Sequence, residues 1–369
     1  MSKISIQNNS QGYQIFLDDA GTQRHLPALW IRAQTFDPEQ RDLVTRQRLF
    51  NPHQLPTNLS LQSAQWQGDD LLLGFSDGYT GIFKVADLLD RVNLTEDMPS
   101  QIPWKADVNP PKFSWPEIVK DEKVFFQALE KFIQYGFLIL TDTPTNRDSI
   151  VDIANQFGYI RDTNFGPYFE VYSRPDSNDL AYRPVAIGPH TDNPYRTPTP
   201  GIQILQCLQN ETSGGDSTLV DSLSVAETVR SQDPEGFKLL CTVPVRFEFQ
   251  DPTTFLVNIS PMIEVDGNGK MLGVLYSPRL DDIGLMSEHD TQRFHQARQE
   301  MGRLFDDPAY EIRFRLLSGE AMMFDNNRVL HGRTEFNPQE GHRQLQGCYI
   351  DRDAPRSHYR VLARKLAAK

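Results

Sequence analysis

The sequence predicts an α+β protein that is mainly β, in which a small β-rich domain (residues 1–98) precedes a larger domain (residues 99–369). Three observations lead to this prediction. Short strand-like segments separated by turns fill the first part of the chain, and a proline-rich connector follows them. Beyond the connector, two helical segments give way to many strands joined by turns rich in glycine and proline. This order is typical of a β-sandwich or a barrel, and periodicity alone leaves both open.

The first domain is predicted from four short apolar segments with the composition of strands, at residues 4–6, 13–17, 28–31 and 71–75. A turn, Ser76-Asp77-Gly78, follows the last of them. The connector is indicated by four prolines within a stretch of little periodicity, at positions 99, 103, 110 and 111. The domain boundary is therefore placed just before Pro99.

The second domain begins with two helices and a strand. Apolar residues recur at helical spacing over residues 125–133, and Gly136 follows as a C-terminal cap. A buried strand is expected at residues 137–140, and a second helix at 150–157. Strands dominate afterwards, with Asp266-Gly267-Asn268-Gly269 as a hairpin loop and a single late helix at residues 294–304.

Composition excludes several classes of function. The formal net charge of −12 opposes non-specific binding of nucleic acid and mildly favours a cationic ligand. No apolar run is long enough to cross a bilayer, and residues 1–9 lack the layout of a secretory signal. The three cysteines, Cys207, Cys241 and Cys348, are too far apart in sequence for a CxxC pair. We therefore expect a cytoplasmic protein with a small-molecule substrate and no membrane or nucleic-acid partner.

Two distant segments carry candidate metal ligands. His190 and Asp192 are two residues apart, and at the end of an extended strand this spacing points both side chains to one side. His331 lies where a second apolar strand, from Met322, is expected to run into a polar loop. Two imidazoles and one carboxylate leave three coordination positions free, as in the facial triad of non-haem iron(II) oxygenases.

Arg343 adds a third component downstream of His331. It lies on what is predicted to be the next strand, which continues through residues 344–349. A planar guanidinium can bind the distal carboxylate of a dicarboxylic cosubstrate through two hydrogen bonds. A surface ion pair is the alternative for this arginine, and a chance HxD pair in a loop is the alternative for His190 and Asp192.

Four pieces of sequence together resemble one family: HTDNPYR at residues 190–196, Gly214-Gly215-Asp216-Ser217, the FDN…LHGR segment at 324–333, and Arg343. The family is the taurine dioxygenase (TauD/TfdA-like) superfamily, and the chain is most similar to its γ-butyrobetaine hydroxylase branch, with a likeness also to 2-(trimethylammonio)ethylphosphonate dioxygenase. The resemblance covers essentially the whole chain, including LPALWIR at 26–32 and FSDG at 75–78.

The resemblance implies a double-stranded β-helix (jelly-roll) catalytic domain and a homodimer. It implies iron(II), 2-oxoglutarate and O2 as cofactors and cosubstrates, with ascorbate as a stimulant. By the same resemblance, His190, Asp192 and His331 bind the iron and Arg343 holds the C5 carboxylate of 2-oxoglutarate. Ser217 would assist cosubstrate binding, although turn capping is an equal alternative for it.

The chain departs from this family in its first domain. In the best-known hydroxylases of the branch, three cysteines and one histidine of this module bind a structural zinc. Here Ala33, Gln34 and Thr35 supply no thiolate, and Tyr79 stands where the histidine would be expected. Tetrahedral zinc needs four such donors, so we predict no structural zinc.

The family binds a trimethylammonium group in an aromatic cage, because ring faces attract a cation that cannot donate hydrogen bonds. Matching the motifs places this cage at Phe165, Phe169, Tyr182 and Tyr349, with Tyr168 and Tyr172 as further walls. Plain core packing is the alternative for all of these rings.

The residues that would bind the anionic end of the substrate differ from those of the relatives. Where relatives carry asparagines, this chain has Asp179, and Arg279 within Ser277-Pro278-Arg279. Arg279 can bind a carboxylate or a phosphonate. Asp179 would repel an anion unless it is protonated, bridged by water or turned away.

The function predicted from these residues is hydroxylation of an aliphatic C–H bond of a small trimethylammonium zwitterion, with release of succinate and CO2. γ-Butyrobetaine and 2-(trimethylammonio)ethylphosphonate are the candidate substrates. Three alternatives remain open: a same-family oxygenase acting on a sulfonate or an amino acid, a zinc hydrolase using the same ligands, and a catalytically silent binding protein.

Overall fold

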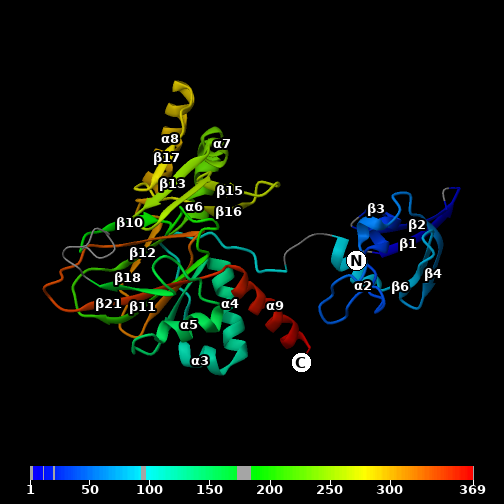
Figure 1. Ribbon diagram of the computed structural model, residues 1–369, viewed down its shortest axis with the longest axis horizontal. Coiled ribbons are helices and arrows are strands. Elements are labelled where there is room, and N and C mark those ends of the chain that lie inside the picture. The colour runs from blue at the N-terminus through cyan, green and yellow to red at the C-terminus, as the bar shows by residue number, and fades with distance from the viewer. Residues whose placement is uncertain (1–2, 11, 20, 93–96, 173–183, 369) are drawn as a thin grey trace. The chain divides into compact units, whose positions relative to one another are not determined.

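The computed structural model describes residues 3–10, 12–19, 21–92, 97–172 and 184–368 (Figure 1). The chain divides into two compact units, Met1–Glu96 and Asp97–Lys369. Both units mix helices with sheets, and strands predominate, as the sequence predicts. Among the helices of the described ranges, none combines the length and the apolar character needed to cross a membrane.

The first unit is built on a six-stranded antiparallel sheet. Its strands are β1 (Lys3–Asn9), β2 (Gly12–Asp19), β3 (Thr22–Leu26), β4 (Leu61–Gln67), β5 (Asp70–Phe75) and β6 (Thr80–Phe83). They run in the order β1-β2-β4-β5-β6, and β3 pairs with β2. The predicted turn after β5 is confirmed, since Gly78 has a φ of 87° and donates its N–H to the Phe75 carbonyl at 3.0 Å. Helix α2 (Val85–Val92) packs on the sheet through Leu88.

The prediction of a strand at residues 28–31 is wrong. These residues form the short helix α1 (Ala28–Arg32), closed by a hydrogen bond of 3.0 Å from the Ile31 N–H to the Pro27 carbonyl. The adjacent side chains of Ile31 and Arg32 are both buried, whereas successive side chains of a strand point to opposite faces. A 3-10 turn, η1 (Pro52–Gln54), lies in the long connection to β4.

Hydrogen bonds join the two positions at which zinc ligands were considered. The hydroxyl groups of Thr35 and Tyr79 lie 2.7 Å apart, and Tyr79 also donates to Asp37 at 3.2 Å. The guanidinium of Arg32 lies 3.8 Å from the centre of the Tyr79 ring and pairs with Asp77 at 3.0 Å. A cation–π contact and hydroxyl hydrogen bonds therefore link this segment to the β5–β6 turn.

The second unit contains two sheets that share an apolar layer. The six-stranded sheet has the order β7-β8-β19-β11-β21-β9, and the four-stranded sheet has the order β10-β20-β12-β18. The strands of the first are β7 (Lys112–Ser114), β8 (Phe137–Thr141), β9 (Tyr168–Tyr172), β11 (Ile202–Asn210), β19 (Ala321–Asp325) and β21 (Arg343–Ile350). Those of the second are β10 (Ile187–His190), β12 (Ser217–Asp221), β18 (Glu311–Phe314) and β20 (Val329–Arg333).

Successive side chains of each strand point alternately to the inner face of the sheet, between the two sheets, and to its outer face, toward the helices. On β11, Ile202 and Ile204 pack against helices, while Leu205 and Cys207 join the layer between the sheets. Leu219 of β12 contributes to that layer from the four-stranded sheet. The side chains of the inner face are therefore the ones that can build a site between the sheets.

Helices cover the outer faces of both sheets (Figure 1). Below the six-stranded sheet lie α3 (Trp115–Lys120), α4 (Glu122–Tyr135), α5 (Ser149–Phe157) and α9 (Asp353–Ala367). Above the four-stranded sheet lie α6 (Ser222–Gln232), α7 (Pro234–Thr242) and α8 (Glu288–Phe305). Near them lie β13 (Val245–Gln250), β14 (Phe255–Ser260), β15 (Ile263–Val265), β16 (Met271–Val274) and β17 (Asp281–Ile283).

The predicted helices at 125–133, 150–157 and 294–304 are confirmed as parts of α4, α5 and α8. Gly136 caps α4 with a φ of 77°, and the hairpin loop at 266–269 joins β15 to β16. The expectation of a single late helix is wrong, because α6, α7 and α9 also form. Asp221 and Asp233 accept hydrogen bonds from the first turns of α6 and α7, so acidic caps begin both helices.

Candidate metal centre

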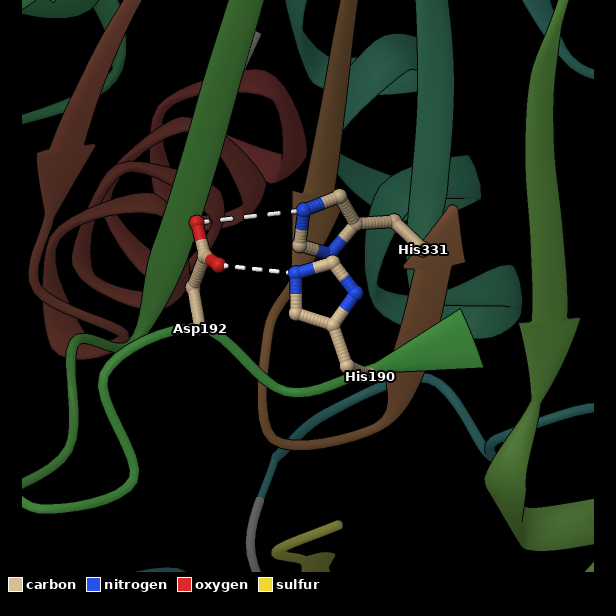
Figure 2. Close-up of side chains that lie close together, drawn as sticks. All are labelled: His190, Asp192 and His331. Carbon is tan, nitrogen blue, oxygen red and sulfur yellow. Dashed lines mark hydrogen bonds and ion pairs between the residues drawn. The ribbon is translucent and has the colours of Figure 1, made fainter. Parts of the chain in front are cut away.

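The pairing of two inner strands brings the two histidines together. His190 at the end of β10 is the Cα partner of His331 on the antiparallel strand β20. Their ring centroids lie 4.3 Å apart. Asp192 follows the end of β10, and Figure 2 shows its two oxygens turned toward the two imidazoles. His331 lies within a strand and not in the preceding loop as expected, because the turn ends at Arg328 and β20 begins at Val329.

The distances among these side chains suit a metal ion. His190 Nε2 lies 3.1 Å from Asp192 Oδ1, and His331 Nε2 lies 3.8 Å from Asp192 Oδ2. One ligand atom from each residue falls within 4.8 Å of the other two. A metal bound at about 2.0–2.2 Å from each atom holds neighbouring ligand atoms roughly 3 Å apart, so small side-chain movements complete the site.

Neighbouring groups hold the ligands in place. The Nδ1 atom of His190 lies 3.0 Å from the Gly188 carbonyl, which leaves Nε2 directed at the site. The main chain of Asp192 is bound on both sides by Asn326, which accepts from its N–H at 2.8 Å and donates to its carbonyl at 3.0 Å. Thr191, which lies between the two ligands in the chain, donates its N–H to the Tyr276 carbonyl at 2.7 Å.

The electrostatics favour the protonation states that bind a metal. Burial opposes ionisation of Asp192, but the two imidazoles and a hydrogen bond from Tyr349 hold its pKa well below the usual range. Burial, followed by the nearby His190, lowers the pKa of His331 to about 3. A carboxylate and a neutral imidazole are the forms required of metal ligands.

A cavity of about 110 Å³ opens beside the three ligands, and they form part of its wall. Arg343 and Ser217, the two residues assigned to the cosubstrate, line the same cavity. Arg343 is buried, donates to the Gly215 carbonyl at 3.3 Å, and forms no ion pair with a carboxylate in the described ranges. Its Nε atom is buried without a hydrogen-bond partner there. A buried cation with an unused donor suits an anionic ligand.

The glycine turn explains how Arg343 reaches the cavity. Gly215 has a φ of 68°, and a Cβ atom there would lie 2.9 Å from Arg343 Nε. The ring of Phe336 lies 5.2 Å from the Arg343 guanidinium and 4.9 Å from that of Arg333. Small residues and a ring face therefore make room for two buried guanidinium groups.

Of the aromatic residues predicted to form the cage, one lines the cavity in the described residues. Phe169 lines the cavity, and its ring lies 5.5 Å from that of Tyr349. Phe165 is 38% exposed and lies outside the cavity wall, edge-on to Phe249 with centroids 6.2 Å apart. Tyr168 packs with the helices on the outer face, and Tyr172 is exposed. Neither is therefore a wall of this cavity.

Of the two residues assigned to the anionic end of the substrate, the structure describes one, Arg279. Arg279 is exposed, and its positive charge contributes to the lowered pKa of His331, so its charge is felt at the metal site. Asp179 and the cage residue Tyr182 lie outside the described residues.

Sequence reasoning missed three polar residues of the site. Arg333 and Gln203 line the cavity, and Asn326 holds Asp192. Arg333 follows His331 by two positions on one strand, so alternation would have placed both on the inner face. Asn326 belongs to the FDN…LHGR segment that carries the family resemblance, which could have drawn attention to it, and Gln203 carries no comparable signal.

Comparisons with known proteins agree with this geometry. The model of the family described as "Taurine catabolism dioxygenase TauD, TfdA family" matches residues 95–349. The chain is 30% identical to the γ-butyrobetaine dioxygenase of Pseudomonas sp. strain AK-1 over 330 residues, which cover 87% of this chain and 86% of that one. It is 26% identical to the mitochondrial trimethyllysine dioxygenase of Gallus gallus, with 93% and 84% covered.

Among solved structures, an asparagine oxygenase in complex with Fe(II) aligns at 17% identity and a TM-score of 0.49, covering 62% of this chain and 79% of that one. The family model spans more than half of the chain, and the first relative passes 30% identity over most of both proteins. The chain therefore belongs to the TauD/TfdA family of iron(II)- and 2-oxoglutarate-dependent dioxygenases.

Proposed function

We propose that the enzyme hydroxylates an aliphatic C–H bond of a small trimethylammonium zwitterion of the γ-butyrobetaine or 2-(trimethylammonio)ethylphosphonate type. The observation that carries the proposal is the buried Arg343 in the same cavity as His190, Asp192 and His331. The relatives support the substrate class, because γ-butyrobetaine and trimethyllysine both carry a trimethylammonium group.

In this proposal the two facing sheets are a double-stranded β-helix that forms the catalytic domain, residues 99–369, after a small domain of residues 1–98. The free cysteines suit a reducing compartment, so we place the enzyme in the cytoplasm. We also propose that it acts as a homodimer, as its sequence resemblance implies.

Each residue of the cavity has a distinct role. His190, Asp192 and His331 bind iron(II), and their open side faces the cavity. Arg343 binds the C5 carboxylate of 2-oxoglutarate through its unused donors, with the Ser217 hydroxyl beside it. When bound, the iron couples decarboxylation of 2-oxoglutarate to oxygen transfer, which yields succinate, CO2 and the hydroxylated substrate.

The apolar wall limits the access of water to the reacting atoms. Phe169, Leu205 and Met322 form part of it, and they come from three strands of the six-stranded sheet. Exclusion of water strengthens the interaction between Arg343 and a bound carboxylate.

The substrate is bound at the mouth of this cavity. The rings of Phe169, Tyr349, Phe165 and Tyr182 attract the trimethylammonium group, and Arg279 binds the carboxylate or phosphonate. Arg279 suits this role because it is exposed, cationic and close enough to act on His331. Asp179 would repel this anion unless it is protonated, bridged by water or turned away.

The test is a screen for substrate-dependent succinate release with iron(II), ascorbate and 2-oxoglutarate. The panel contains quaternary ammonium carboxylates and phosphonates, and also sulfonates and amino acids. His190→Ala is the blank, and His289→Ala is its matched control, because the His289 side chain is 85% exposed on α8. Stimulation by a trimethylammonium compound supports the proposal. Stimulation only by sulfonates or amino acids overturns the substrate class, and activity with zinc in place of iron overturns the oxygenase.

A further inference from the structure

Tyr349 contacts a metal ligand directly. Its hydroxyl donates a hydrogen bond of 2.9 Å to Asp192 Oδ2, although the two residues are 157 positions apart in the chain. Only 4% of Tyr349 is exposed, so the tyrosine hydroxyl is held in the protein interior beside this carboxylate oxygen. A ring that only bound substrate would not need its hydroxyl directed at Asp192.

The two oxygens of Asp192 have different surroundings. Oδ1 lies 3.1 Å from His190 Nε2, while Oδ2 accepts from Tyr349 and lies 3.8 Å from His331 Nε2. Asn326 binds the N–H and the carbonyl of Asp192, which fixes its main chain. The rotation of the carboxylate is therefore restrained by Tyr349 at Oδ2 and by His190 at Oδ1.

Asn193 lies near Tyr349. Burial and Asp192 raise the pKa of Tyr349 and Asn193 opposes this rise, while the buried Asn193 amide nitrogen forms no hydrogen bond in the described ranges. On the other side of this amide, Tyr195 donates to Asn193 Oδ1 at 2.6 Å. Asn193 has a φ of 50°, a conformation that asparagine tolerates better than most residues. The side chain of Asn193 therefore lies between two buried tyrosines, Tyr195 and Tyr349, and the second of these contacts the metal ligand Asp192.

We propose that Tyr349 is a positioning residue for Asp192, and that it holds Oδ2 so that Oδ1 is the oxygen presented to the metal. This inference rests on the proposed function, since it assigns the metal to His190, Asp192 and His331. A hydrogen bond to a charged acceptor is stronger than one between neutral groups, which suits it to fix one rotamer of the carboxylate. Residues that orient metal ligands change metal affinity when they are removed.

The positioning role of Tyr349 predicts a result that differs from the result expected of an aromatic cage wall. Tyr349→Phe keeps the ring and its contact with Phe169, and it removes only the hydroxyl. If Tyr349 positions Asp192, iron(II) affinity falls by about 10- to 100-fold, the range found when such partners are lost. If Tyr349 serves only as an aromatic wall, iron(II) affinity stays unchanged and only the KM for the substrate moves.

The experiment is an anaerobic titration of iron(II) against a chromophoric chelator, for the wild-type protein and for Tyr349→Phe. Tyr310→Phe is the matched control, because it also removes a buried tyrosine hydroxyl, whose partner is Thr228 at 3.0 Å on helix α6. The expected result is weaker iron(II) binding by Tyr349→Phe and unchanged binding by Tyr310→Phe. Equal iron(II) affinity in all three proteins, or an equal loss in both variants, overturns the inference.

A second variant, Asn193→Gly, tests the same inference if Tyr349→Phe does not fold. Asn193→Gly removes the amide beside the hydroxyl and leaves a residue that tolerates the positive φ. It should weaken iron(II) binding less than Tyr349→Phe does. Unchanged iron(II) affinity in Asn193→Gly would contradict the inference. Failure of the wild-type protein to bind iron(II) at all would instead overturn the proposed function.

Discussion

Asn326 is joined to Asp192 through both main-chain groups of the aspartate. Its Oδ1 accepts from the Asp192 N–H at 2.8 Å, and its Nδ2 donates to the Asp192 carbonyl at 3.0 Å. The same amide donates to the Pro200 carbonyl at 2.9 Å, and Asn326 is fully buried. The turn between β19 and β20 thus holds the segment after β10, and so two distant parts of the chain define one metal centre.

The first prediction concerns this amide. Asn326→Ala leaves buried main-chain groups of Asp192 without partners, and each such group costs roughly 1–3 kcal/mol of unfolding free energy. Urea denaturation measures the loss. Asn146→Ala is the control, because its amide bonds only to an exposed neighbouring carbonyl. A loss in Asn326→Ala no larger than that in the control would contradict the account.

The second prediction concerns Arg343. Arg343→Met replaces a buried cation that forms no ion pair in the described ranges with an apolar side chain, so the ligand-free protein should lose little or no stability. Binding of 2-oxoglutarate should be lost, and with it the rise in Tm that a ligand of the folded state produces. Thermal unfolding with and without 2-oxoglutarate measures both effects. Arg313→Met, at a side chain 57% exposed, should keep the rise in Tm, and a rise retained by Arg343→Met would refute the assignment.

The third prediction concerns the aromatic wall. Phe169→Leu removes a ring face next to the cavity, and a cation–π contact of about 0.5–2 kcal/mol corresponds to a roughly 2- to 30-fold higher KM for a trimethylammonium substrate. The affinity for a neutral analogue with carbon in place of the quaternary nitrogen should change less. Steady-state succinate assays and competition by the analogue make the comparison. Phe255→Leu, at an exposed ring, is the control. Equal changes for the charged and neutral compounds would argue against the cage.

The fourth prediction concerns a buried ion pair of the second unit. Arg328 pairs with the buried Asp221 at 3.0 Å and donates to the Ile102 and Gln134 carbonyls, each at 2.8 Å. Arg328→Met leaves a buried carboxylate unpaired and should cost about 3–5 kcal/mol of unfolding free energy, which Arg328→Met/Asp221→Asn should partly restore. Urea denaturation tests this, with the exposed Arg303→Met as control. A double variant less stable than the single one would contradict the explanation.

Local patterns predicted the elements that carry strong local signals. The stripe of Phe125, Leu129 and Phe132, with Gly136 behind it, predicted α4, and the spacing of His190 and Asp192 predicted their shared side. The five residues of α1 are too few for periodicity to separate helix from strand. The helices α6 and α7 were missed although Asp221 and Asp233 are typical N-caps.

The family resemblance predicted that His190, Asp192 and His331 come together, but contacts that depend on strand register or on a turn could not be predicted from the sequence. Matching the motifs with the family assigns Tyr349 to the aromatic cage and gives its hydroxyl no role. Its bond to Asp192 depends on the register of β21 beside β11, and no local pattern encodes that register. The bond of Asn326 to Asp192 spans 134 positions and depends on the turn between β19 and β20 in the same way.

The most direct test of the central claim is anaerobic visible absorption on mixing the enzyme with iron(II) and 2-oxoglutarate. Chelation of iron(II) by the keto acid produces a charge-transfer band, and the wild-type protein should develop this band at saturating concentrations of both. The band should be absent from His331→Ala and Asp192→Ala, and it should require much more 2-oxoglutarate in Arg343→Met. A wild-type protein without the band, or a His331→Ala variant that retains it, would contradict the account.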